Sequence, residues 1–156
     1  MKITSVATVL CLAFIGCMAD AQSATQNARS TSIKVSDFVR SAHDDRVSIF
    51  VFAGTLVSPV PPRQPQRFCF IKSMPEFRAD FDVEQVLAGR RVAHARVAFE
   101  GCAFPSDEDY SIGDHLLVFA VVVNGGEFVG RLVLSADQKT EAKAALDAAL
   151  KKSVRP

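Results

Sequence analysis

The clearest pattern in the chain is a pair of apolar runs separated by a turn, between residues 113 and 134. The first run, residues 116–123, is rich in β-branched side chains, and the second spans residues 128–134. The Asn124-Gly125 pair between them accepts positive φ angles, so the stretch predicts a β-hairpin. Because the first run is continuous rather than alternating, we expect a strand covered on both faces and central to the fold.

Four further strands are predicted before this hairpin. Residues 47–57 form an apolar run in which Gly54 indicates a bulge or a bend, and residues 67–72 form a shorter strand. Residues 76–87 alternate between apolar positions (Phe77, Ala79, Phe81, Val83) and charged positions (Arg78, Asp80, Asp82, Glu84). Residues 92–99 return as a strand with His94 and Arg96 on its polar side. This alternation predicts half-exposed antiparallel strands.

Helical patterns stand at the two ends of this β-rich region. Residues 38–42 predict a short helix after the N-cap candidates Ser36 and Asp37, at the end of a polar leader that begins at Gln22. The C-terminal segment predicts a longer amphipathic helix with a capping box formed by Ser135 and Gln138. Its apolar stripe consists of Ala142, Ala145, Leu146, Ala149 and Leu150.

The first 21 residues have the features of a secretory signal peptide. Lys2 supplies the positive charge, residues 6–18 the apolar segment, and residues 19–21 an A-x-A site with cleavage between Ala21 and Gln22. A second processing route is open, because residues 14–17 resemble a bacterial lipobox that would make Cys17 an acylated N-terminus. We therefore expect a periplasmic or secreted protein, or alternatively a membrane-anchored lipoprotein whose only membrane contact is the lipid.

Two of the four cysteines remain in the predicted folded part of the chain, Cys69 and Cys102. In an oxidising compartment, two cysteines most simply form one disulfide, although two buried free thiols are the alternative. A metal site would need more ligands than these two residues provide.

Composition and charge exclude several classes of function. The chain has 18 basic and 17 acidic residues, a balance that argues against a nucleic-acid binder. His43, His94 and His115 lie on separate predicted elements without metal-ligand spacing, and alternating charges on a strand are typical of a solvated face. We assign no catalytic, cofactor-binding or metal-ligating residue.

The order of these elements resembles that of the netrin-like domains. This group of OB folds includes the tissue inhibitors of metalloproteinases and many bacterial secreted proteins. The resemblance covers roughly residues 47–150 and rests on residues 50–57, residues 81–89, a cysteine near position 102, and residues 112–120. It implies a mainly β fold, a small Greek-key OB-type β-barrel with a C-terminal amphipathic α-helix. The inhibitors of this group chelate the zinc of their target through a free N-terminal cysteine, whereas simple cleavage here exposes Gln22.

These observations predict a signal peptide over residues 1–21, a flexible leader with a short helix over residues 22–46, and one OB-like domain over residues 47–152. We expect an exported, non-enzymatic module that binds another protein, with no cofactor. The alternative, by analogy with the family alone, is an inhibitor of an extracellular protease, of the metalloprotease class or another.

Overall fold

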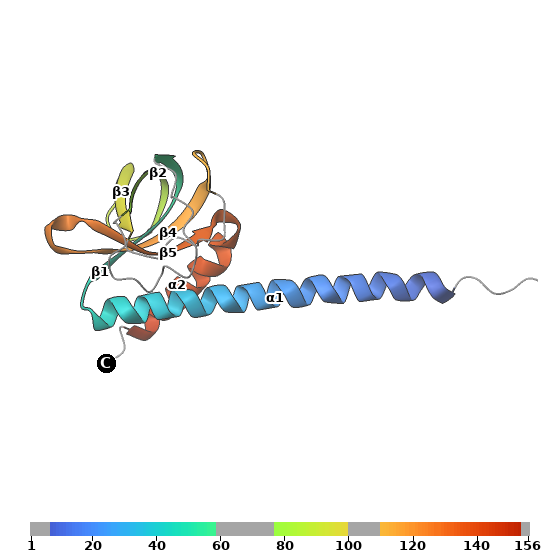
Figure 1. Ribbon diagram of the computed structural model, residues 1–156. Coiled ribbons are helices and arrows are strands. Elements are labelled where there is room, and N and C mark those ends of the chain that lie inside the picture. Colours follow the sequence, from blue (N-terminus) through green and yellow to red (C-terminus); the bar gives the residue numbers. More distant parts are fainter. Residues whose placement is uncertain (1–6, 59–76, 100–109, 154–156) are drawn as a thin grey trace, which may run out of the picture.

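The computed structural model describes residues 7–58, 77–99 and 110–153, which form a five-stranded mixed sheet and two helices (Figure 1). The predicted strand at 67–72, Cys69 and Cys102 lie outside these residues. The elements are α1 (Ala7–Asp44), β1 (Ser48–Ser58), β2 (Phe77–Ala88), β3 (His94–Phe99), β4 (His115–Val122), β5 (Phe128–Ser135) and α2 (Lys139–Ser153).

The sheet is mainly antiparallel and its strands are hydrogen-bonded in the closed order β1-β2-β3-β5-β4. β1 pairs with β2 on one side and with β4 on the other, and both pairings are antiparallel. β3 and β5 form the parallel pair, with Val97, Ala98 and Phe99 opposite Phe128, Val129 and Gly130. A register shift between Ala53 and Gly54 confirms the irregularity predicted in the first strand.

The predicted hairpin is confirmed by β4, β5 and the turn between them. The two strands are antiparallel, and the turn at Asn124–Gly126 has φ angles of 84° at Gly125 and 82° at Gly126. β4 is covered on both faces, as its continuous apolar run predicted. Leu117 and Phe119 belong to the cluster under the helices, whereas Leu116 and Val118 belong to the cluster enclosed by the sheet.

Five phenylalanine rings dominate the cluster enclosed by the sheet. Phe50 stacks on Phe128 with ring centroids 4.2 Å apart and lies 5.0 Å from Phe52. Phe81 contacts Phe52 and Phe99 edge to face, at centroid distances of 5.5 Å and 6.3 Å. Phe81 is 1% exposed, which confirms the apolar face predicted for β2. Each such pair contributes about 0.5–1.5 kcal/mol beyond the burial of its surface.

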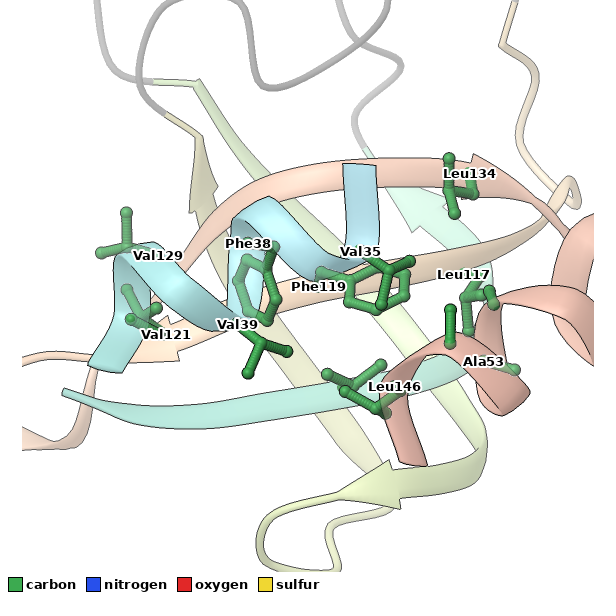
Figure 2. Packing of buried hydrophobic residues seen from close by; sticks show 14 residues of the cluster. Val35, Phe38, Val39, Ala53, Leu117, Phe119, Val121, Val129, Leu134 and Leu146 are labelled. Carbon is green, nitrogen blue, oxygen red and sulfur yellow. The ribbon is translucent and has the colours of Figure 1, made fainter. Parts of the chain in front are cut away.

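The second cluster lies between the sheet and the helices (Figure 2). The ring of Phe38 on α1 packs edge to face on Phe119 of β4, with centroids 5.4 Å apart. Leu146 of α2 is 1% exposed in the same layer, and Ala142 and Ala145 are buried beside it. The predicted apolar stripe of the C-terminal helix is therefore confirmed.

α1 differs from the flexible leader expected over residues 22–46. It continues through that segment as a single helix and ends at Asp44. The physical reason is that Val35, Phe38, Val39 and Ala42 have helical spacing and are all buried, while residues 22–44 contain neither glycine nor proline. Figure 1 shows the N-terminal half of α1 running past the sheet. The last part of the helical leader, from Thr31 to Ala42, is thus part of the packed structure.

The ends of the two helices also show local detail that the sequence did not predict. α1 ends in two hydrogen bonds, from Arg46 N to His43 O and from Val47 N to Ala42 O, with Arg46 at a φ of 56°. This is a Schellman motif in which an arginine occupies the left-handed position that usually holds glycine.

The capping box predicted before α2 does not form. The Ser135 side chain makes no capping hydrogen bond, although Ser135 lies at the N-cap position of a 3₁₀ turn, Ala136–Gln138, that precedes α2. The Gln138 amide instead donates a hydrogen bond of 3.0 Å to Oγ1 of Thr31, a residue of α1 that is 1% exposed. This bond fixes the start of α2 against α1.

Candidate functional site

The helices cover the outer side of β1, β4 and β5, and the charged side of β2 and β3 is left facing solvent. Along β2, every second side chain from Arg78 to Glu84 points outward, while Ala79 and Phe81 are buried. The face therefore follows directly from the alternation of the sequence, combined with the position of the two helices.

The first pair on this face joins Asp80 of β2 to Arg96 of β3, which are register partners. The guanidinium donates two hydrogen bonds, from Nε to Oδ1 at 2.7 Å and from Nη2 to Oδ2 at 2.9 Å. The hydrogen bond from Arg96 lowers the pKa of the Asp80 carboxyl, with desolvation opposing it, and the same contact raises the pKa of Arg96. A bidentate geometry of this kind fixes the orientation of both side chains.

The second pair joins Asp82 to His94, one step further along the same two strands. Oδ1 of Asp82 lies 2.7 Å from Nδ1 of His94, and the two residues are also register partners. Both side chains are more than half exposed, at 61% and 81%. The contact is therefore a solvent-facing hydrogen bond, which orients the imidazole ring and contributes little to stability.

The third group brings together Glu84 of β2, Thr55 of β1 and His115 of β4. The Thr55 hydroxyl donates to Oε1 of Glu84 at 2.6 Å, and Nδ1 of His115 lies 2.7 Å from the same oxygen. The hydrogen bond from Thr55 is the main cause of a lowered pKa at Glu84; desolvation opposes it, and His115 and the charge of Lys139 lower it further.

This third group resembles a hydrolytic triad in composition but not in geometry. In a triad, the carboxylate binds one nitrogen of the imidazole and the hydroxyl nucleophile binds the other. Here the Thr55 hydroxyl lies 3.3 Å from Nδ1 of His115, the nitrogen that already contacts Glu84. The arrangement orients the three groups on one another and does not activate the hydroxyl for attack.

The two histidines occupy the ends of one row of register partners, in the order His94, Asp82, Thr55, His115 across β3, β2, β1 and β4. Three strand spacings separate the ends of the row, a distance of about 14 Å. The two rings are therefore too far apart to bind one ion together. Among the described residues, no group of three or more His, Cys, Asp or Glu side chains could hold a metal ion.

Two exposed apolar residues lie at the same end of the sheet. Val57 of β1 is 39% exposed and Ile112 is 65% exposed. Hydrogen bonds from Leu56 N to Asp114 O and from Gly113 N to Leu56 O hold the segment of Ile112 against the end of β1. Val57 also lines a shallow depression together with Asp80, Asp82, His94 and Arg96. We call the seven residues of the three polar groups the polar face, and Val57 with Ile112 the apolar pair.

The structure brings together some of the residues weighed from the sequence and separates others. The three carboxylates of β2 do share one face, and they are joined by two of the three histidines, whereas His43 lies apart at the end of α1. Cys17, Ala21 and Gln22 fall within α1, and their processing stays a prediction. Sequence reasoning missed the pairing of β2 with His94 and His115, because it depends on strand register.

Comparisons with protein-family models, with curated proteins and with solved structures find no match. Within the described residues, neither helix is long and apolar enough to span a membrane.

Proposed function

We propose that this protein is an exported, non-enzymatic module that binds another protein through the polar face and the apolar pair. We further propose that its sheet is a Greek-key barrel of the OB type, as in the netrin-like domains. The closed order β1-β2-β3-β5-β4, with its parallel pairing of β3 and β5, supports this assignment. The signal-like first 21 residues support export to the periplasm or beyond.

The observation that carries the proposal is the exposure of Val57 and Ile112 beside oriented polar side chains. Interfaces between proteins combine an apolar centre with polar groups at the rim, and large exposed apolar residues gathered at one place mark such sites. The side chains of Asp80 and Arg96 are already fixed by two hydrogen bonds, so less conformational entropy is lost when a partner docks on them.

The chemistry of the polar face favours recognition over catalysis. Thr55 and the two histidines direct their hydrogen bonds to carboxylates of β2, so these groups satisfy one another. The face also lacks the excess of positive charge that binding to nucleic acid requires, because three carboxylates stand against Arg96 and two histidines.

A charge-exchange variant tests the proposal. Asp80→Arg combined with Arg96→Asp keeps an ion pair at the same register position but reverses its direction, so stability should change by less than about 1 kcal/mol. The matched control exchanges Asp147 and Lys151, an exposed pair on α2 with i,i+4 spacing.

Each protein is used as bait in a pull-down from an envelope fraction. We expect the wild type and the α2 control to capture the same partner and the β2–β3 exchange to lose it. A partner retained by the β2–β3 exchange contradicts the assignment of the face. Inhibition of an extracellular metalloprotease by the purified protein, with no captured partner, would support the inhibitor alternative instead.

A further inference from the structure

We propose that the groove between α1 and α2 binds a single-chain alkyl carboxylate, with the hydrocarbon chain on the apolar floor and the headgroup held by Arg40 and Lys152. This inference is independent of the proposed function, because the groove is formed by the helices and the polar face by the strands. It is carried by the shape, the lining and the charge of the groove.

The groove exists because the two helices run side by side in the same direction. The hydrogen bond from Gln138 to Thr31 joins them at one end, and Arg40 and Lys152 line the groove toward the other end. The space between them has a volume of about 350 Å³. Small-molecule sites in proteins have volumes of about 300–1,000 Å³, so the groove has room for a small ligand.

The floor of the groove is apolar and continuous with the core under the helices. Val39 and Ala145 are 5% and 8% exposed, and Ala149 is half-buried beside them. Ser32 and Ser36 complete the lining on α1 with side chains too short to fill the space above this floor. Covering such a surface with an alkyl chain removes apolar area from water and is therefore favourable.

One end of the groove is cationic. Arg40, His43 and Lys152 line it, and no carboxylate is among its lining residues in the part of the chain that the structure describes. Asp37 and Asp44 lie 3.6 Å from Arg40 and 3.7 Å from His43, but all four side chains are more than half exposed, so these contacts are weak. The guanidinium therefore stays available for a carboxylate, which it can bind with two parallel hydrogen bonds.

The position of these cations also selects the charge of the headgroup. α1 ends at Asp44 and α2 ends at Ser153, so the carbonyl ends of both helices give this end of the groove a partial negative charge. Arg40 and Lys152 offset part of that charge and stabilise the helices. The positive charge that remains suits one carboxylate and disfavours a phosphate monoester, which carries a charge of about −1.5 to −2.

The direct test is a titration of ¹⁵N-labelled protein with dodecanoate below its micelle concentration, with the affinity measured by calorimetry. We expect the backbone amide signals of Val39, Ala145 and Ala149 to shift. Dodecyltrimethylammonium has the same chain with the opposite charge, and acetate has the headgroup without the chain. Both should bind at least about tenfold more weakly than dodecanoate. Unchanged amide signals, or equal binding of the ammonium compound, would overturn the inference.

A first pair of variants tests the headgroup site. Arg40→Gln/Lys152→Gln removes the two cations of the groove, whereas Arg131→Gln/Lys143→Gln removes the same charge from exposed positions that do not line it. We expect the groove variant to bind dodecanoate at least about tenfold more weakly and the control to stay within about twofold of wild type. Equal affinities of the two variants contradict the assignment of the cations, and tighter binding of dodecyl phosphate than of dodecanoate contradicts the assignment of the headgroup.

A second pair tests the position of the chain. Ala148→Leu places a larger side chain in the groove, and Ala144→Leu adds the same side chain to α2 outside it. Both positions are exposed, so both variants should fold, which circular dichroism verifies. We expect only Ala148→Leu to lose dodecanoate binding. An Ala148→Leu protein that binds dodecanoate as tightly as Ala144→Leu refutes the placement of the ligand between the helices.

Discussion

Replacing Gly130 by alanine should destabilise the protein strongly, because the added methyl group would collide with a buried ring. Gly130 of β5 is the register partner of Phe99 of β3. A Cβ atom at this position would lie 2.0 Å from Cε1 and 2.4 Å from Cδ1 of Phe99. Carbon atoms in favourable contact are about 3.5–4.0 Å apart, so the ring would have to retreat by roughly 1.5 Å.

The ring has little space to retreat into. Phe99 is 2% exposed and packs edge to face on Phe81, which itself packs on Phe52. Overpacking costs about 1–3 kcal/mol, and disturbing the aromatic contact costs about 0.5–1.5 kcal/mol more. We therefore expect Gly130→Ala to lower the free energy of unfolding by about 2–4 kcal/mol. The gain in stability that alanine brings by restricting the unfolded chain is smaller than this loss.

Urea melts followed by circular dichroism measure this loss, and two further variants make the result specific. Gly125→Ala places a methyl group where nothing lies within 4 Å, so it should cost only the roughly 1–2 kcal/mol of a left-handed residue. Adding Phe99→Leu to Gly130→Ala should cost less than the sum of the two single changes, because the smaller side chain makes room. A Gly130→Ala protein within about 0.5 kcal/mol of wild type would refute the packing described for β3 and β5.

Three other predictions concern separate parts of the structure. Arg46→Gly should raise the free energy of unfolding by about 0.5–1 kcal/mol by relieving the left-handed backbone at the end of α1, and a urea melt that shows a loss instead would contradict the Schellman geometry. Phe81→Ala should cost about 3–5 kcal/mol and Asp82→Ala under about 0.5 kcal/mol, and the reverse order in parallel melts would mean that the two faces of β2 are exchanged. Because Arg96 lowers the pKa of Asp80 below its ordinary value of 3.8, the pair stabilises the fold above that value and this contribution is lost as the pH falls through the lowered pKa. The stability difference between wild type and Arg96→Gln should therefore be constant from about pH 7 to 5 and shrink below about 3.8, and a difference that grows with acid would exclude the assigned pair.

The parts of the fold that the sequence predicted are those fixed by local pattern. The continuous run in β4 and the glycine turn after it specify a hairpin without reference to the rest of the chain, and the alternation in β2 specifies its buried face. α1 was predicted poorly because its middle part, residues 22–32, is rich in Ser, Thr and Gln, residues that do not distinguish a helix from an irregular leader. Its last four buried residues have helical spacing, but the partners that bury them are distant in sequence.

The candidate site was less predictable than the fold, because register decides it. Asp82 lies opposite His94 only because the connection between β2 and β3 has the length observed. A short turn centred on Gly89 would have shifted the register of the two strands, and these residues would not be partners. Glu84 contacts His115, 31 residues away, because β2 and β4 are the two neighbours of β1 in the closed order. No local sequence pattern indicates either of these carboxylate–histidine contacts. From the sequence alone, the carboxylates were therefore interpreted only as a solvated face.

The contact between α1 and the rest of the protein has a consequence for the order in which the molecule folds. α1 leaves the ribosome before the strands, but Phe38 packs on Phe119, and the hydrogen bond between Gln138 and Thr31 joins positions 107 residues apart. β1 likewise can pair with β4 only after β4, which begins at His115, has been synthesised. Contacts between distant positions must await loop closure, so folding is slow and the apolar stripe of α1 stays uncovered until β4, β5 and α2 have been synthesised. A nascent chain that ends before β4 would therefore lack a core, and a chaperone that holds the N-terminal segment would act during the whole of this interval.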